Sequence, residues 1–361
     1  MNEQARTVAA ERLGALVADM FAAAGVPRAA AAEVAGGLVD ADLDGLHSHG
    51  VMLVDMYIER LRAGSVTTRE RAEVVSERAG AVVLDAGHAL GQLTGPQAMT
   101  IAINKAKEFA AGIVSVRHGF HFGTAGRYAQ QAAAADCIGI AMCNTRPLMP
   151  APGGGERVVG NNPIAIAIPV AGEIPLVLDM ATSEAAMGKI RMADKAGRPI
   201  PATWAVTAAG EPTTSAADAI AGMLLPSGGA KGFGLSFMID MLCGLLSQGA
   251  TGDAVRPLYG DFSVAYDCSH LFIAIDVAHF GDPQQFRAHA AAAAERIRAG
   301  KRAPGVAQVF TPGEPEWRRR QRAAGAVTLE PPVIAMLQRY AEQLGVPTPL
   351  FDEPARESHH A

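Results

Sequence analysis

Apolar runs of strand length alternate with helix-length segments through the middle of the chain, and this alternation constrains the fold most. Residues 112–116 and 138–143 are short apolar runs, and residues 124–135 between them have the length and spacing of a helix. Strands interleaved with helices build layered α/β structures. We therefore predict an α/β fold with further strands at residues 81–84, 163–168, 175–178 and 271–275 and another helix at residues 95–111.

Both ends of the chain carry helical patterns instead. Leu13, Leu16, Val17 and Met20 recur at the spacing of one helix face, and Gly25 follows as a stop signal. The two ends should form one discontinuous, largely helical part around the α/β middle. Its other helices are predicted at residues 29–44, 51–63, 283–299 and 331–344.

Charge and cysteine content exclude several classes of protein. The net charge of -5 gives no broad basic surface, so nucleic acid is not expected as a partner. The four cysteines form no CxxC pair, and the chain begins with a polar segment, so we expect a reducing, cytoplasmic location. Residues 219–246 are the most apolar stretch, but Lys231 and Asp240 make them a poor membrane span.

A polar break between two predicted helices holds His47, Ser48 and His49. A histidine in such a place can exchange a proton near neutral pH, and Ser48 could orient the ring of His49. The alternative is that His49 only caps the following helix. On these residues alone, both interpretations stay open.

Two further segments follow strands or open helices and contain small residues. Residues 117–124 lead from a predicted strand into a helix, where free backbone N–H groups suit a phosphate, although an ordinary turn would look the same. Lys231 lies among glycines at residues 228–234, but the segment lacks the spacing of a P-loop. Between them, residues 144–163 form a long glycine-rich loop of the kind that often carries function.

Taken in order, these segments resemble the malate / L-lactate / L-sulfolactate dehydrogenase-like family, whose fold is α/β but not Rossmann. The resemblance covers about residues 13–345, and although each motif is weak by itself, their order is specific. The motifs are Ser48-His49-Gly50-Val51, Gly91-Gln92, His121-Phe122-Gly123, Gly160-Asn161-Asn162-Pro163, Asp179-Met180-Ala181-Thr182-Ser183, Lys231-Gly232-Phe233-Gly234, His270-Leu271-Phe272 and Pro312-Gly313-Glu314.

The resemblance implies an oxidoreductase that uses NAD(H) or NADP(H) on a small-molecule substrate and forms a homodimer. His49 would be the proton donor with Ser48 beside it, and His121 would lie by the nicotinamide. Residues 116–284 would bind the cofactor, and residues 1–115 with 285–361 would form the substrate and dimerisation domain. The implied cofactor contacts are His121, Phe122, Gly123, Thr124, Ala125, Asp179, Met180, Ala181, Lys231, Gly232, Pro312, Gly313 and Glu314.

This sequence departs from the family on the substrate side. The arginine that usually grips the substrate carboxylate is replaced by Leu53, the polar residue before the second histidine is Phe120, and a usual threonine is Asn161. With Thr145, these residues should line the substrate, and Arg146 is the candidate to replace the missing arginine. We therefore expect a C=O or cyclic C=N substrate that is not a simple 2-oxo acid. Lysine at Lys189, where imine reductases carry an aspartate, favours a carbonyl.

The sequence also bears on three other classes of function. Loss of the family arginine would suit an altered or inactive member that acts as a binding protein. His47, His49, His118 and His121 could cluster around zinc, although no metal is expected. A serine hydrolase is disfavoured because the chain has no GxSxG motif.

Overall fold

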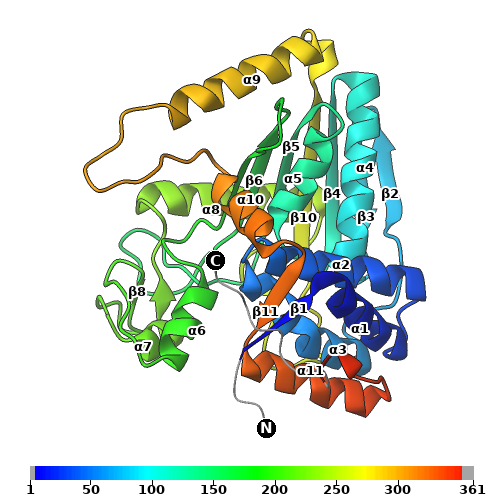
Figure 1. Ribbon diagram of the computed structural model, residues 1–361, viewed down its shortest axis with the longest axis vertical. Coiled ribbons are helices and arrows are strands. Elements are labelled where there is room, and N and C mark those ends of the chain that lie inside the picture. The colour runs from blue at the N-terminus through cyan, green and yellow to red at the C-terminus, as the bar shows by residue number, and fades with distance from the viewer. Residues whose placement is uncertain (1–4, 352–361) are drawn as a thin grey trace.

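A computed structural model describes residues 5–351, and its centre is a seven-stranded mixed sheet (Figure 1). Only β3 and β4 pair in parallel, and every other neighbouring pair in this sheet is antiparallel. In spatial order the strands are β2 (Glu73–Arg78), β3 (Ala81–Asp85), β4 (Ala111–Gly119), β10 (Cys268–Asp276), β5 (Cys137–Cys143), β6 (Ile164–Ile168) and β7 (Leu176–Met180).

Helices cover the two faces of this sheet. α4 (Gly91–Phe109) and α5 (Ala125–Ala133) pack on one face, and α8 (Ala230–Ser247) packs on the other. Side chains alternate between the faces of a strand, so Ala141 joins the large core while Met142 packs with residues of α8. A side chain at Gly139 would overlap the backbone of Ala129, which explains how closely α5 approaches β5.

The two ends of the chain meet in a second layer. β1 (Arg6–Ala9) pairs antiparallel with β11 (Ala326–Leu329), more than 300 residues later in the sequence. Around this pair lie α1 (Ala10–Ala23), α2 (Arg28–Leu43), α3 (Val54–Ala63) and α11 (Pro331–Leu344), and Figure 1 shows them beneath one end of the large sheet. The short helices η1 (His47–His49) and η2 (Val51–Leu53) connect α2 to α3.

A smaller lobe lies beside the sheet, at the lower left of Figure 1, and has its own core. It contains α6 (Met187–Lys195), α7 (Ala216–Ala221) and the paired strands β8 (Ala205–Val206) and β9 (Met223–Leu224). The other elements are η3 (Gly252–Ala254), η4 (Val277–His279), α9 (Pro283–Arg298), α10 (Glu314–Ala323) and η5 (Pro349–Phe351).

The structure confirms the α/β fold and each predicted strand, with shifts of a few residues at the ends. Sequence reasoning missed β1, β2, β8, β9, β11, α6, α7 and α10. The division into two domains stays a prediction, although its boundary at residue 115 lies inside β4 and the large sheet continues across it.

α8 is also the single helix among residues 5–351 that is long and apolar enough to cross a membrane, judged by length and composition alone. Core helices of soluble proteins pass the same test. Here one side of α8 packs on β4, β5 and β10, with Ile239 and Cys243 buried against the sheet.

Candidate active site

The structure brings the two expected histidines together. His49 ends η1, and His121 follows the end of β4. Their rings stack with centroids 5.5 Å apart and planes 24° apart. Both side chains are half-buried. Two imidazoles that are 72 residues apart in the sequence therefore share one partly enclosed place, which is what an acid–base site requires.

Asp42 fixes the turn that presents His49. Its buried carboxylate binds Nδ1 of His47 at 2.8 Å and accepts the backbone N–H of Val51 at 2.8 Å. A side chain at Gly50 would overlap this carboxylate, so the turn requires glycine there. Hydrogen bonds from both sides of the turn to this buried carboxylate hold His49 in a defined position. Ser48 Oγ then contacts Nδ1 of His49 at 3.0 Å.

His121 is held from behind by a chain of hydrogen bonds. Gln92 Nε2 donates to the hydroxyl of Tyr57 at 2.7 Å, and that hydroxyl lies 2.6 Å from Nδ1 of His121. Because the Tyr57 oxygen accepts from Gln92, its own proton is free to be donated to Nδ1. Nε2 of the neutral His121 ring then carries the proton and is left for a ligand.

Burial keeps both histidines neutral at pH 7. It lowers the pKa of His49 below its usual value of 6.5. Burial lowers the pKa of His121 further, to about 3, with smaller contributions from His49 and His270. Two neighbouring imidazoles cannot both carry a proton easily. A proton that enters this site therefore goes to His49 first.

A pocket of about 420 Å³ opens between α2, α5, β7 and the start of α10. This volume is within the range of about 300–1,000 Å³ that is usual for small-molecule sites. Four residues that the resemblance assigned to the cofactor line it: Thr124, Asp179, Pro312 and Gly313. Segments far apart in the sequence therefore build one cavity, as a dinucleotide site needs.

Asp179 and the start of α5 form one wall of this pocket. Asp179 accepts the backbone N–H of Gly126 at 2.7 Å, in the first turn of the helix. Its side chain is open to the pocket, but protein surrounds the pocket closely, and this desolvation raises the pKa of Asp179 to about 6. Charge from Glu316 and Asp44 adds to the shift.

The other predicted cofactor residues are not among those that line this pocket. Phe122 and Ala125 are buried on either side of Gly123 and Thr124, and Met180 and Ala181 continue from Asp179. Lys231 and Gly232 open α8, where Gly232 packs against the backbone of Thr182.

Glu314 is the exception among these residues because its carboxylate is already paired. It binds Arg298 at 2.8 Å and Arg318 at 2.8 Å and accepts from Thr311, and these contacts outweigh burial and lower its pKa to about 2. Its side chain braces α10 and the loop before it, so any cofactor contact at this position would come from the backbone.

Two of the expected substrate residues are buried behind the histidines. Leu53 has 2% and Phe120 1% of its surface exposed, and the Phe120 ring packs edge-on to Tyr57 with centroids 5.0 Å apart. Thr145 is hydrogen-bonded to Asn161 at 3.3 Å and to Asn162 at 3.1 Å. Leu53 and Phe120 therefore belong to the large apolar core, whereas Thr145 and Asn161 form a polar pair.

Arg146 is half-buried and has no hydrogen bond or ion pair within residues 5–351. Burial lowers the pKa of its guanidinium, and the charge of Arg157 adds to this. Its charge also acts on Tyr266, whose ring packs against Phe120 with centroids 6.2 Å apart. A half-buried cation that has no hydrogen bond or ion pair within residues 5–351 is suited to bind an anion.

The four-histidine zinc site that was considered does not form. His47 is bound to Asp42 instead, and Nδ1 of His118 is bound to Asp85 at 3.0 Å. The single group of metal-type ligands among the described residues lies elsewhere.

Sequence reasoning did not assign roles to Tyr57, Gln92 or Asp42. Gln92 belongs to one of the family motifs, so that motif was the available signal. Tyr57 and Asp42 carried no such signal, because each acts through a neighbour that only the fold supplies.

Comparison with known proteins decides the family. Residues 8–338 match the model of the malate/L-lactate dehydrogenase family. The chain belongs to this family. It is 36% identical to ureidoglycolate dehydrogenase (NAD(+)) of Escherichia coli over 88% of this chain and 90% of that protein. It is 37% identical to (2R)-3-sulfolactate dehydrogenase (NADP(+)) of Chromohalobacter salexigens, over 79% and 85%.

Among solved structures, the chain resembles sulfolactate dehydrogenase of Methanocaldococcus jannaschii with a TM-score of 0.89 and 34% identity. That likeness covers 96% of this chain and 99% of the other. These matches confirm the expected family and its non-Rossmann α/β fold. Like these relatives, this member of the malate/L-lactate dehydrogenase family is an oxidoreductase.

Proposed function

We propose that this enzyme transfers a hydride between NAD(H) or NADP(H) and a C=O or cyclic C=N substrate, with His49 as the acid–base residue. The observations that carry this proposal are the stacked pair of His49 and His121 and a pocket lined by four residues that the resemblance assigned to the cofactor. The names of the relatives, which include both an NAD(+) and an NADP(+) enzyme, support the cofactor class.

The residues present fit a dinucleotide. Thr124, Asp179 and Gly313 line the pocket, and the first turn of α5 adds backbone N–H groups. A Cβ at position 313 would lie 2.9 Å from the backbone oxygen of Val177. Glycine therefore lets this segment lie close to β7 in the wall of the pocket. When bound, the nicotinamide cofactor supplies the hydride donor or acceptor.

His49 handles the proton. Ser48 contacts Nδ1 of His49, so Nε2 is the nitrogen left for the substrate. In reduction, protonated His49 donates to the new alkoxide or amine, and in oxidation neutral His49 accepts the proton of the substrate. His121 stays neutral and, held by Tyr57, presents an N–H that can position the substrate oxygen or the nicotinamide.

Arg146 supports an anionic substrate that binds differently from a simple 2-oxo acid. Position 53, where a carboxylate-binding arginine is usual, is a buried leucine. Arg146 lies in the loop after β5, on a different segment from position 53. We propose that a negative group placed further from the reacting carbon pairs with Arg146, and that pyruvate and oxaloacetate are poor substrates.

The first experiment is titration of the purified enzyme with NADH and with NADPH, followed by nicotinamide fluorescence. Tight binding of either, followed by turnover in a screen of larger oxo acids, ketones and cyclic imines, is the expected result. His49→Asn should lower kcat by about 10²-fold or more with an unchanged cofactor Kd. If neither nucleotide binds, the proposal fails.

Arg146→Ala separately tests the proposal that a negative group of the substrate pairs with Arg146. Loss of a ground-state anion contact should raise KM about tenfold or more and change kcat less, and Arg146→Lys should recover part of it. Arg256→Ala, an exposed arginine outside the site, is the matched control. Efficient reduction of pyruvate or oxaloacetate by the wild-type enzyme would refute this part while leaving the hydride-transfer proposal intact.

An altered family member without activity is the second candidate, and the replacement of the usual arginine by Leu53 is the observation that favours it. Such a protein would bind NADH or NADPH in the same titration. It would then turn over none of the screened compounds, and His49→Asn would have no measurable effect.

We also propose that two copies associate through the exposed side of α8, which lies within the predicted cofactor-binding residues 116–284 and not within the predicted dimerisation domain. Large apolar side chains there are 38–60% exposed, although α8 is apolar on all sides and such helices are normally covered. Because α8 already covers the sheet, a second copy suits it better than a membrane. The exposed residues are Leu235, Phe237, Met238, Leu242, Leu245 and Leu246.

Light scattering after size exclusion should give the mass of two chains. Leu245→Glu should shift the mass toward one chain, because it places a charge in the apolar contact. Val74→Glu, at an exposed apolar residue of β2, should leave the dimer unchanged. A monomeric wild type would contradict the proposal.

We place the enzyme in the cytoplasm, with no nucleic acid or membrane partner, on its cysteine content and net charge.

A further inference from the structure

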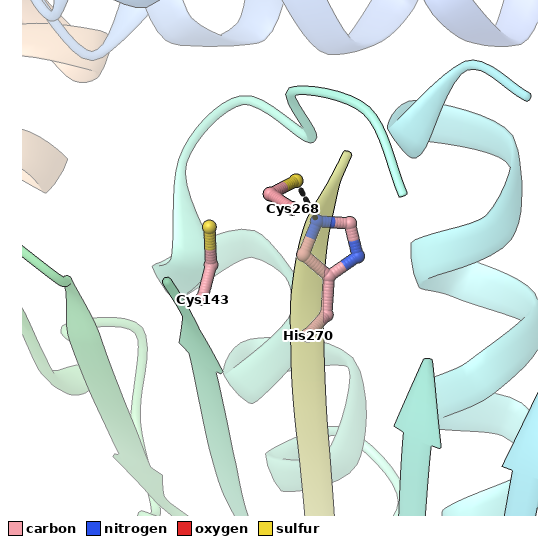
Figure 2. Close-up of side chains that lie close together, drawn as sticks. All are labelled: Cys143, Cys268 and His270. Atoms are coloured by element: carbon pink, nitrogen blue, oxygen red, sulfur yellow. Dashed lines mark hydrogen bonds between the residues drawn. The ribbon is translucent and has the colours of Figure 1, made fainter. Parts of the chain in front are cut away.

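Three metal-type ligand side chains meet inside the protein, and none of them has a role in the proposed reaction. Cys143 ends β5, and Cys268 and His270 begin the neighbouring strand β10 (Figure 2). His270 is the register partner of Cys143. The pairing of β10 with β4 shifts register between Cys268 and His270, and Cys268 belongs to the same core cluster as Cys143. The sheet itself therefore places the three side chains on one face, the face covered by α5.

The geometry of this group suits a tetrahedral metal. The ligand atoms of all three residues lie within 4.8 Å of one another, and Cys268 Sγ is 3.2 Å from Nε2 of His270. With zinc–sulfur bonds of about 2.3 Å, two sulfurs in a tetrahedral site lie about 3.8 Å apart. A movement of at most about 1 Å would bring the three atoms to bonding positions.

The surroundings of the group fit the charge of a divalent ion. All three residues are buried, with 4% of Cys143 and none of Cys268 or His270 exposed. Two thiolates and a neutral imidazole would balance a 2+ ion, so that no net charge is placed in the interior.

The other two cysteines show what ordinary buried thiols look like in this chain. Cys137 begins β5 at its far end, and Cys243 lies on α8 across the sheet. Neither belongs to a group of three metal-type ligands within residues 5–351. The cluster is therefore specific to one end of the β5–β10 pair.

We propose that Cys143, Cys268 and His270 form a binding site for a thiophilic divalent cation, with Zn²⁺ as the best match. Binding releases the two thiol protons and leaves the fourth position of the ion to a water. The His270 ring stacks on Phe122 with centroids 4.5 Å apart. The ion would thus brace the segment that carries His121. This proposal does not rest on the proposed reaction.

Cobalt provides the direct test, because Co²⁺ takes zinc sites and gives intense visible bands when four-coordinate, with a near-ultraviolet band from thiolate ligands. Reduced, EDTA-treated full-length enzyme without a tag is titrated with Co²⁺ under argon and then with Zn²⁺. We expect thiolate-type bands that saturate at one Co²⁺ per chain and are abolished by Zn²⁺. Cys268→Ser and Cys143→Ser should lose most of the thiolate band, and Cys243→Ser should keep it.

A second measurement guards against variants that fail to fold. Circular dichroism checks each variant, and thermal unfolding is followed with and without Zn²⁺. Zn²⁺ should raise the melting temperature of the wild type and of Cys243→Ser by several degrees but leave Cys268→Ser unchanged. Absence of a thiolate band in the wild type would overturn the proposal, and so would equal loss of the band in Cys243→Ser and Cys268→Ser.

Discussion

At the scale of single residues, Tyr57 is the contact that sets the state of His121. Tyr57→Phe keeps the buried ring but removes the 2.6 Å hydrogen bond to Nδ1 and leaves Gln92 Nε2 without its acceptor. We expect kcat to fall about tenfold, by analogy with other orienting hydrogen bonds, and stability to fall by about 1–3 kcal/mol from the unpaired amide. Steady-state kinetics and urea unfolding measure the two effects.

Tyr340→Phe is the matched control for this prediction, since Tyr340 is a buried tyrosine on α11. It should leave kcat unchanged. Equal kcat for the wild type and Tyr57→Phe would show that the tautomer of His121 does not matter for turnover.

The lowered pKa of His49 predicts opposite pH profiles for the two directions of the reaction. Reduction needs protonated His49, so its kcat should fall as pH rises through a pKa below 6.5. Oxidation needs neutral His49, so its kcat should rise over the same range and then stay level. His121, with a pKa of about 3, stays neutral between about pH 5 and about pH 8 and adds no step there.

The measurement is kcat in both directions from about pH 5 to about pH 8. His49→Asn should flatten both profiles at a low rate, and His289→Asn, at an exposed histidine of α9, should preserve them. A reduction rate that increases with pH would be incompatible with His49 as the proton donor.

At the scale of elements, the start of α5 meets the end of β7 at one glycine. A Cβ at Gly126 would lie 2.9 Å from Oδ2 of Asp179, which is the far end of a flexible side chain. Gly126→Ala should therefore push Asp179 into the pocket and weaken cofactor binding about tenfold without unfolding the protein. Gly36→Ala in α2, where no atom lies within 4 Å, should bind cofactor normally and gain up to about 1 kcal/mol of stability.

Isothermal titration calorimetry with the preferred cofactor separates these two variants, with thermal unfolding as the check on the fold. If both variants bind like the wild type, the contact between α5 and β7 does not shape the cofactor site.

The sequence predicted the helices and strands whose own residues carry a clear apolar pattern, and it missed those whose own residues do not. Residues 138–143 and 271–275 are apolar enough to identify a strand, because β5 and β10 are buried on both faces. β1 and β11 are four residues each and pair across the whole chain, so neither end shows the pairing by itself. β2 is an exposed edge strand, and α10 is rich in arginine with little apolar surface.

The same distinction holds for the candidate site. The resemblance assigned roles to His49 and His121, but only the fold places their rings 5.5 Å apart. Tyr57 follows no motif, and the meeting of Cys143 with Cys268 depends on which strands are neighbours in the sheet.

At the scale of the whole molecule, the pocket gathers charge from four elements, and that charge predicts which cofactor is preferred. Asp40, Asp44, Asp179 and Glu316 line it together with only two cations, Arg127 and Arg320. Arg320 is already bound to Asp40 at 3.0 Å and to Asp44 at 2.6 Å. The lining is therefore acidic overall.

NADH and NADPH differ only in the 2′-phosphate, so any difference in affinity reports how the protein receives that group. An acidic lining repels it, and we expect NADH to bind at least about tenfold more tightly than NADPH. Asp179→Asn should reduce this ratio because it removes one of the repelling charges, whereas Asp253→Asn, at an exposed acid on η3, should not. The ratio should also shrink at high salt, where the charge of the pocket is screened. Equal affinities for the two cofactors at low salt would show that the 2′ position lies outside this pocket.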